Sequence, residues 1–595
     1  MSLWHIGNTT VRTPYRLREA LIVLKNSEFC GSLLGQEREA GFTELLHEKS
    51  IVRVDRLDGS VKKPADDVGR KWRIALAQLG FIVKHLGRPK EIQQRGIDHK
   101  IEPFTTGFPG LTGRPYEITP NGSRLITAEN IAAQQECYLR ALASYRIPSI
   151  FETDYKFPPF SPLRFVLEIL LYLENSGEEA VIKLGEMAAI VQCSTPAHGI
   201  EKVVLEILSY RKERDKSGNK KKFDDEKRID AVLVLEKSVK AGTLNDYADL
   251  NFRYLKATGL FQSKGRAIVL LPEKQTLAEL LTSEEFEIPD DSTYVKNLWK
   301  GAALPTDDRV KTLEILSRLT TQLKGHGEEI KEVDLTGMSL AELTQRRHSI
   351  EERLMHLKEL YFAEGQADLW HEIINILSAF TGSKRKRVSR GEEAIKIQRG
   401  EHPAYFEWII WRAFLAVDSL ENKPWESRRF KIDQDFLPLS HAPGGGPDMV
   451  FEFEDFVLVV EVTLTSSSRQ EAAEGETVRR HVAEIAERFA GTGKRVYCMF
   501  IAPDIDSNTA DTFKSGNWYK KDDTKLPLQI VPIALDGFIT FLEAGFSAGD
   551  LKPPRIKELI VECRAVSNRD APEWKREISS EIKRLTSRFR QNKGA

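Results

Sequence analysis

Two acidic residues near position 450 have the types and spacing needed to bind a metal ion. A glycine-rich segment, residues 443–447, leads into a hairpin whose two-residue turn we place at Glu454 and Asp455. This register sets Asp448 opposite Glu461, and opposed residues on antiparallel strands have Cβ atoms about 4.5–5.5 Å apart. Two carboxylates at that separation repel each other unless a cation lies between them, and Mg²⁺ prefers oxygen ligands. The sequence therefore predicts a magnesium site at this hairpin.

An alternative interpretation is an edge hairpin whose acidic side chains point into water. The apolar run Phe456–Val460 directly before Glu461 argues against it, because such a run is typical of a buried strand. A carboxylate in a buried strand needs a partner. We therefore favour metal binding.

The segment after the hairpin is expected to add a third carboxylate. Residues 466–489 begin with capping residues and continue with helical periodicity. The apolar stripe of this helix comprises Val478, Val482, Ile485 and Phe489. Extended backwards, the stripe reaches Glu474 and then Glu471. Acidic residues also suit the positive end of a helix dipole, but that alternative does not explain why they continue the buried stripe.

Glu407 is the fourth acidic candidate. It is the only acid in residues 405–415, a predicted helix that is apolar on nearly every side. The alternative is an ion pair with Arg412 or another cation. We favour Glu407 as an outer member of the metal cluster.

The acidic pair also matches a known motif. Asp448, followed by Glu461-Val462-Thr463 at the end of an apolar strand, resembles the PD-(D/E)XK nuclease motif, with Thr463 in place of the usual lysine. A threonine has no positive charge with which to orient an attacking water.

Longer runs resemble a specific family. The substitution at Thr463, with the sequences GGGPD at 444–448, EVTLT at 461–465 and RQExxEGE at 469–476, resembles the AlwI family of type IIS restriction endonucleases. That family includes natural nicking enzymes. Residues 6–12 and 251–261 also resemble it, so the resemblance extends through most of the chain.

The resemblance implies Mg²⁺-dependent hydrolysis of DNA at a site built from carboxylates. The catalytic roles carry over here onto Glu407, Asp448, Glu461 and Glu474, the last three as metal ligands. Mn²⁺ is expected to substitute for Mg²⁺. The implied products carry a 5′-phosphate and a 3′-hydroxyl.

We expect a multidomain chain with α+β and α/β parts to position these four acids. The resemblance implies winged-helix-like recognition subdomains, a linker and a C-terminal cleavage domain. The expected parts are a first winged-helix-like DNA-recognition subdomain (1–150), a second one (151–290), a helical linker (291–385) and a PD-(D/E)XK-like nuclease domain (386–595) with a central mixed sheet flanked by helices. A basic run at 382–387 marks the end of the linker.

Helical periodicity supports the two recognition subdomains. The predicted elements are helices at 67–79, 165–173, 184–191 and 247–258, and a strand at 265–271. Helices followed by a wing are typical of winged helix-turn-helix domains. Residues 116–125 resemble a wing and the last helix of such a domain, and a generic strand–turn–helix is an equal alternative for them. The candidate DNA contacts are Arg70, Lys71, Arg73, Arg253 and Lys256. The basic stretch 211–222 is expected to be a mobile, solvated loop, with a phosphate clamp as the less favoured alternative.

Composition and short motifs exclude other classes. Lys and Arg total 87 and Asp and Glu 88, so the net charge of −1 does not by itself indicate nucleic acid or membrane. No apolar stretch approaches the roughly 18 residues of a membrane helix, and residues 1–20 lack a signal-peptide core, so we expect a cytoplasmic protein. The five cysteines have no C-x-x-C spacing, which disfavours a zinc finger or disulfide framework. Residues 491–494 (GTGK) resemble half a P-loop, but we interpret them as a helix-ending turn.

The predicted function is a sequence-specific, type IIS-like DNA endonuclease, for restriction or strand nicking, that cuts at a fixed distance from its recognition site. One alternative is a winged-helix DNA-binding protein with a degenerate nuclease domain, motivated by Thr463. A non-nuclease Mg²⁺ enzyme is disfavoured because no nucleotide-binding loop accompanies the acids. The predicted partner is double-stranded DNA. One acidic cluster per chain means that double-strand cleavage requires a second copy, a second subunit or sequential cuts.

Overall fold

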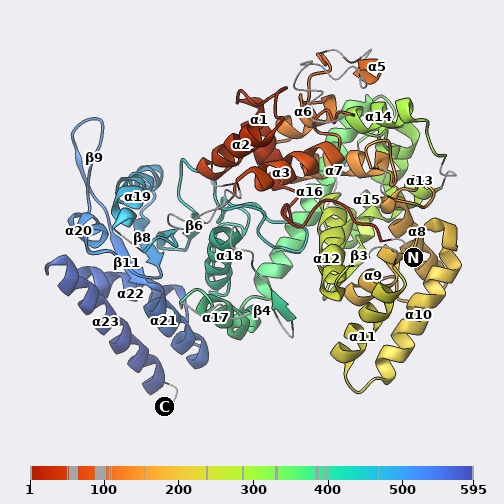
Figure 1. Cartoon of the computed structure of the whole chain (residues 1–595). Helices are drawn as coiled ribbons and strands as arrows, with labels where there is room; N and C mark the ends of the chain where they lie inside the picture. The colour runs from red at the N-terminus through yellow and green to blue at the C-terminus, as the bar shows by residue number, and fades with distance from the viewer. Residues whose placement is uncertain are drawn as a thin grey trace. The chain divides into compact units, whose positions relative to one another are not determined.

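The computed structural model divides the chain into two compact units, Met1–Leu354 and Met355–Ala595 (Figure 1). The division falls within one long helix, α16 (Leu340–Glu364). The basic run at 382–387 lies outside the described residues, and the finer division at 150, 290 and 385 stays a prediction. The structure describes residues 3–49, 51–52, 65–86, 102–105, 108, 110–152, 155–235, 239–283, 287–328, 333–381, 388–390, 393–395, 397, 401–417, 419–466 and 468–592.

Unit 1 is mostly helical and contains a small antiparallel sheet of order β1-β3-β2. Four of the predicted helices correspond to α3, α8, α9 and α12, and the predicted wing strand corresponds to β3. The helices and strands are α1 (Arg16–Lys25), α2 (Gln36–Glu48), α3 (Ala65–Gln78), α5 (Glu102–Thr105), α6 (Pro120–Thr127), α7 (Ile131–Ser144), α8 (Pro162–Asn175), β1 (Ile182–Lys183), α9 (Leu184–Ala189), α10 (Ile200–Lys216), α11 (Lys220–Leu233), α12 (Ala241–Ala257), β2 (Phe261–Lys264), β3 (Ala267–Leu270), α13 (Gln275–Thr282), α14 (Asp291–Lys300) and α15 (Arg309–Gly325).

The expected mobile loop at residues 211–222 is wrong. Helices α10 and α11 cover all of this stretch except residues 217–219. Arg211 points inward, and its Nε lies 2.8 Å from Oε1 of the fully buried Glu186. A buried ion pair of this kind fixes the helix in place, and a run of charges in the sequence does not reveal it.

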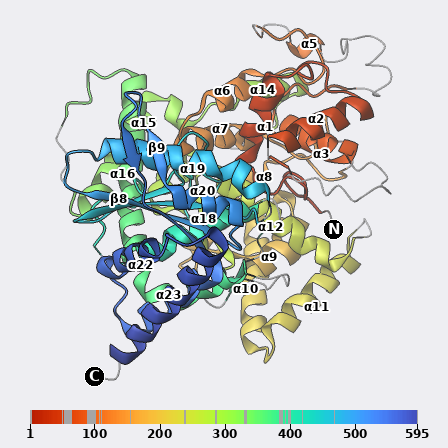
Figure 2. The ribbon, with the colours of Figure 1, turned by 90° about the vertical axis from the view of Figure 1, so that its left-hand side faces the viewer.

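Unit 2 is built on a four-stranded mixed sheet of order β11-β8-β7-β6, which confirms the expected mixture of helix and sheet. Strand β7 pairs antiparallel with β6 and parallel with β8, and β8 pairs parallel with β11. In both views α19 lies on one side of the sheet, and α22 and α23 lie on the other (Figures 1 and 2). The elements are α17 (Trp370–Ser378), β4 (Val388–Arg390), β5 (Glu393–Ile395), α18 (His402–Leu415), β6 (Met449–Glu452), β7 (Phe456–Val462), α19 (Arg469–Arg488), β8 (Arg495–Ala502), α20 (Ser507–Ser515), β9 (Asn517–Tyr519), β10 (Lys525–Pro527), β11 (Ile530–Ala534), α21 (Leu535–Ala548), α22 (Pro553–Ala565) and α23 (Ala571–Asn592).

The β6–β7 hairpin has the register predicted from the sequence. Phe451 pairs with Leu458, so that Asp448, one residue before β6, lies opposite Glu461. Strand β7 is buried from Phe456 through Glu461, which excludes the solvated edge hairpin. The core around the hairpin includes the stacked rings of Phe414 on α18 and Phe451, whose centroids lie 4.7 Å apart.

The remaining global predictions concern membranes, cysteines and the GTGK run. No helix in the described parts of the chain is both long and apolar enough to span a bilayer. All five cysteines are free thiols. Residues 491–494 form the turn between α19 and β8, with positive φ at Gly491 and Gly493, so the predicted helix-ending turn is confirmed.

Candidate active site

The opposed pair Asp448 and Glu461 forms the centre of an acidic cluster in unit 2. The N–H of Val462 donates to Asp448 Oδ2 (2.9 Å), and the N–H of Asp448 lies 3.4 Å from Glu461 Oε2. Burial, reinforced by neighbouring carboxylates, raises the pKa of Asp448 well above its usual range and that of Glu461 to about 8. Buried acids whose pKa values are raised in this way are stabilised as anions by a cation placed between them.

Helix α19 brings Glu474 to the same pair. The Thr463 hydroxyl, just beyond β7, bonds to the Glu474 carboxylate, whereas burial raises the pKa of Glu474. Glu476 is exposed, and its Oε1 lies 3.3 Å from Arg480 Nε. The two glutamates therefore point to different sides of the helix, as expected for residues about 200° apart.

Glu407 extends the cluster from α18. Its side chain is buried, and its Oε2 accepts a hydrogen bond from the N–H of Ala442 (2.6 Å). Burial, and then the charge of Asp448, raises the pKa of Glu407 well above its usual range. The alternative ion pair with Arg412 is not formed, because Arg412 Nη1 lies 2.7 Å from Glu372 Oε1 instead.

His481 belongs to the cluster although the sequence analysis did not single it out. Its Nδ1 lies 2.7 Å from Glu461 Oε1, and the residue is 3% exposed. Burial lowers the pKa of the imidazole, and its Nε2 is buried without a hydrogen-bond partner among the described residues. The available signal was helical position, since His481 follows Glu474 by seven residues, or about two turns, on the same stripe.

The donor set of this cluster fits a magnesium ion that is only partly coordinated by protein. Among the described residues, no lysine or arginine forms an ion pair with any of the four carboxylates. No group of three or more His, Cys, Asp or Glu side chains in the same residues is positioned to hold one ion. Mg²⁺ is usually held by one or two carboxylates, with waters and substrate phosphates completing its shell. Asp448 and Glu461 suit that role, and Glu474 lies near them without completing a shell of three carboxylates.

The predicted DNA contacts on α3 divide into surface and internal residues. Arg70 and Lys71 both pair with Asp67 and keep much of their side chains in solvent. Arg73 instead lies 2.6 Å from Glu39 and is mostly buried. We therefore interpret Arg73 as a residue that joins α2 to α3.

The predicted contacts on α12 are less enclosed. Arg253 Nε lies 3.0 Å from Asp249 Oδ2, and Lys256 Nζ lies 3.0 Å from Ser263 Oγ on the wing strand β2. Both side chains stand on one helix that is followed directly by the β2–β3 hairpin.

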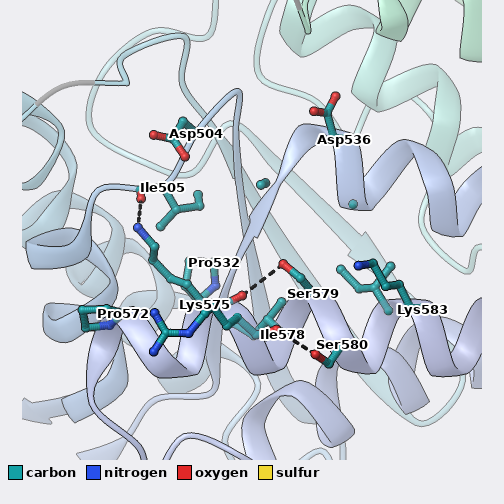
Figure 3. Close-up of a pocket in the computed structure, with 14 residues that line it drawn as sticks. Asp504, Ile505, Pro532, Asp536, Pro572, Lys575, Ile578, Ser579, Ser580 and Lys583 are labelled. Carbon is teal, nitrogen blue, oxygen red and sulfur yellow. Dashed lines mark hydrogen bonds between the residues drawn. The ribbon is translucent and has the colours of Figure 1, made fainter.

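A cavity of about 630 Å³ elsewhere in unit 2 is a separate feature (Figure 3). Its lining comes from the residues after β8, from β11 with the start of α21, and from α23. Lys575 on α23 is turned to the protein, and its Nζ donates to the carbonyl of Ile505 (2.6 Å). None of the four acidic candidates lines this cavity. We assign the candidate active site to the acidic cluster, because buried carboxylates perturb one another's pKa there.

Comparison with known proteins identifies one family. A model of the AlwI restriction endonuclease family matches residues 77–541, a range that contains all four acidic candidates. No curated protein matches the chain. Among solved structures, the small subunit (R.BspD6I2) of the heterodimeric restriction endonuclease R.BspD6I is 23% identical, with a TM-score of 0.28 over 36% of this chain and 99% of that one. The BpuJ1 endonuclease binding domain, crystallised with pyrene- and phenanthrene-modified DNA, is 11% identical, with a TM-score of 0.28 over 47% of this chain and 89% of that one.

Proposed function

The chain belongs to the AlwI restriction endonuclease family, and we propose that it hydrolyses a DNA phosphodiester bond at the acidic cluster of unit 2 with Mg²⁺ as cofactor. The observation that carries this proposal is the opposed pair Asp448 and Glu461, whose buried carboxylates have raised pKa values. When bound there, the ion supplies a water of lowered pKa and neutralises charge that develops on the phosphate. Mn²⁺ is expected to substitute, since it accepts the same oxygen ligands.

Each residue of the cluster has a geometric reason for its proposed role. Asp448 and Glu461 hold the ion, and the Val462 N–H fixes the orientation of Asp448. His481 contacts Glu461 through Nδ1 and thereby orients that carboxylate. Glu474, bonded to the Thr463 hydroxyl, is placed to orient the attacking water.

Glu407 acts at the outer edge of the cluster. One of its oxygens is occupied by the Ala442 N–H, which leaves the other oxygen free to order a water molecule. The water oxygen bonds to phosphorus and gives up a proton to solvent, while the bond between phosphorus and the 3′-oxygen breaks and the 3′-oxygen takes up a proton from solvent. The products then carry a 5′-phosphate and a 3′-hydroxyl.

We propose that unit 1 recognises the DNA sequence. Helices α8, α9 and α12, with the antiparallel β2–β3 hairpin directly after α12, support a winged-helix arrangement, in which Lys256 contacts Ser263 on the wing strand β2 and Arg253 stands on the same helix as Lys256. Recognition by residues 1–290 and cleavage by residues 386–595 gives type IIS behaviour, with a cut at a fixed distance from the site. The described residues hold one such acidic cluster, which gives one cut per binding event, so that a second copy or subunit is required for simultaneous cleavage of both strands.

The test is incubation of plasmid DNA with the full chain in Mg²⁺, in Mn²⁺ and in EDTA, followed by sequencing of the ends. We expect metal-dependent ends with a 5′-phosphate at a constant distance from one short sequence. The control is Asp448→Asn, which keeps the shape of the side chain and removes its charge. Specific DNA binding without cleavage in either metal would favour the alternative of a degenerate nuclease domain, which Thr463 motivates.

A further inference from the structure

The acidic cluster needs a positive group that its own ion pairs do not supply. Thr463 stands where PD-(D/E)XK nucleases carry a lysine, and its hydroxyl is engaged with Glu474. A phosphodiester attacked here gains negative charge in the transition state, close to four carboxylates. A preorganised donor aimed at that charge is the largest single contribution in many enzymes.

The backbone places Arg429 beside the acidic pair. The segment around Arg429 runs along the outer side of β6, where Arg428 forms an antiparallel bridge with Met449. One residue further along, the N–H of Arg429 donates to the carbonyl of Asp448 (3.2 Å). Opposed residues in antiparallel pairs project from the same face of a sheet. Arg429, Asp448 and Glu461 therefore form a row across three adjacent segments on one face.

Arg428, the neighbouring arginine, has a different role, because successive side chains of an extended segment project from opposite faces. Arg428 projects from the other face and pairs with the buried Glu359, with Nη2 2.9 Å from Oε2. Arg429 has no ion pair with any described residue. Arg428 therefore holds the fold together, whereas no acid in the described parts of the chain pairs with Arg429.

The guanidinium of Arg429 lies against the glycine-rich loop. Its Nη2 donates to the carbonyl of Gly444 (3.3 Å), and its Nη1 is buried with no hydrogen-bond partner among the described residues. A Cβ added at Gly446 would lie 2.5 Å from Nη1. The loop therefore holds the group in place, and at least one N–H donor remains unused.

We propose that Arg429 is a catalytic residue, whose guanidinium donates to a non-bridging oxygen of the scissile phosphate in place of the missing lysine. This inference rests on the proposed function and extends it. The planar guanidinium presents several N–H donors to phosphate oxygens and keeps its proton throughout. In the reaction, the water oxygen bonds to phosphorus and gives up a proton to solvent, while the bond to the 3′-oxygen breaks and that oxygen takes up a proton from solvent. Arg429 stabilises the extra charge without exchanging a proton.

The first test compares Arg429→Ala and Arg429→Lys in the full chain by single-turnover cleavage at saturating DNA and Mg²⁺. Loss of one such donor costs about 10²–10³-fold in rate, so we expect Arg429→Ala to be slowed by about that factor. The rate of Arg429→Lys is expected to lie between those of the wild type and Arg429→Ala, because lysine keeps the positive charge but lacks the paired N–H donors of the guanidinium. Guanidinium chloride at millimolar concentration should raise the cleavage rate of Arg429→Ala at least about tenfold, whereas urea at the same concentration should not. The control is Arg555→Ala, since Arg555 is already paired with Asp550 and Glu558.

The second test moves the guanidinium without removing it. Gly446→Ala places a methyl group against Nη1, at the flexible end of the arginine side chain, and should slow cleavage at an unchanged melting temperature. Gly325→Ala, on α15 outside the glycine-rich loop, is the control, because its Cβ would also meet no heavy atom within 4 Å. We expect Gly325→Ala to cleave at the wild-type rate.

The outcomes separate this inference from the proposed function. If the wild-type chain does not cleave DNA in Mg²⁺, the proposed function fails and the role of Arg429 fails with it. If the wild type cleaves and Arg429→Ala stays within about threefold of its rate, only the role of Arg429 is overturned. A slow Arg429→Ala that guanidinium does not restore and that melts at a lower temperature than Arg555→Ala would show a structural role, and would also overturn the inference.

Discussion

Glu461→Gln should stabilise the metal-free protein while abolishing cleavage. The pKa of Glu461 is raised from its ordinary value near 4.5 to about 8, chiefly by burial. Between these two values the folded chain holds a proton that the unfolded chain releases, so the free energy of unfolding falls as the pH rises through this window. Glutamine resembles the protonated form and removes that dependence.

The size of the effect follows from the shift. One pKa unit corresponds to about 1.36 kcal/mol, so at pH 7 the raised pKa of Glu461 costs the folded state up to about 3 kcal/mol. The substitution also weakens the contact with His481, which offsets about 1 kcal/mol. We therefore expect a net gain of about 1–3 kcal/mol, or a rise in melting temperature of about 2–10 °C.

The assay is thermal unfolding in EDTA from pH 5 to pH 8.5, followed by the same series with Mg²⁺. The difference between Glu461→Gln and wild type should grow with pH in EDTA. Mg²⁺ should stabilise the wild type and have little effect on the variant, because the ion binds the ionised pair. The matched control is Glu359→Gln, a buried glutamate of the same unit that is paired with Arg428 and should lose about 3–5 kcal/mol. If Glu461→Gln were destabilised like this control in EDTA, the reasoning that the acidic pair costs stability without a bound cation would be wrong.

The remaining predictions concern catalysis and acid stability. Asp448→Ala and Glu461→Ala should each abolish Mg²⁺-dependent cleavage with specific DNA binding unchanged in a gel-shift assay; cleavage by either variant within about tenfold of wild type would refute their assignment. Glu474→Ala should lower the single-turnover rate by about two orders of magnitude, with partial recovery in Mn²⁺, whereas the exposed Glu476→Ala should cleave like wild type; equal rates for the two would mean that the acids of α19 only complement the helix dipole. In unit 1, burial lowers the pKa of His85 to about 4, so this group favours the folded state fully above its ordinary pKa near 6.5 and costs stability as the pH falls from there towards 4. His85→Gln should reduce that loss, by up to about 3 kcal/mol in acid denaturation curves, and an unchanged pH dependence would refute the assignment.

The opposed acidic pair could be predicted because a local rule fixes it. A two-residue turn at Glu454 and Asp455 determines which residues face each other, and strand alternation does the rest. The side of α19 that carries Glu474 was predictable for a similar reason, since helical periodicity extends a stripe of apolar residues in a known direction. In both cases the information lies within about 30 residues of sequence.

The rest of the site depends on contacts that local rules do not supply. Arg429 comes to Asp448 through a single bridge between the preceding segment and β6, with no turn signal to announce it. The expected loop at 211–222 failed because Arg211 reaches a buried partner, Glu186, across 25 positions of the chain. Helical periodicity could have placed His481 on the same side of α19 as Glu474. Its contact with Glu461 depends on how α19 packs against β7, which periodicity does not give.

The approach of Gly446 to Arg429 has a consequence for how this family diversifies. Gly446 has no positive φ that demands glycine, and the three heavy atoms nearest to a Cβ placed there all belong to the end of the Arg429 side chain. We therefore expect selection on this glycine to act through Arg429. The two positions should change together during evolution: lineages that lose the arginine should accept alanine or serine at 446, and lineages that keep it should keep glycine. A pair of residues 17 positions apart should thus covary more strongly than either does with its neighbours in sequence.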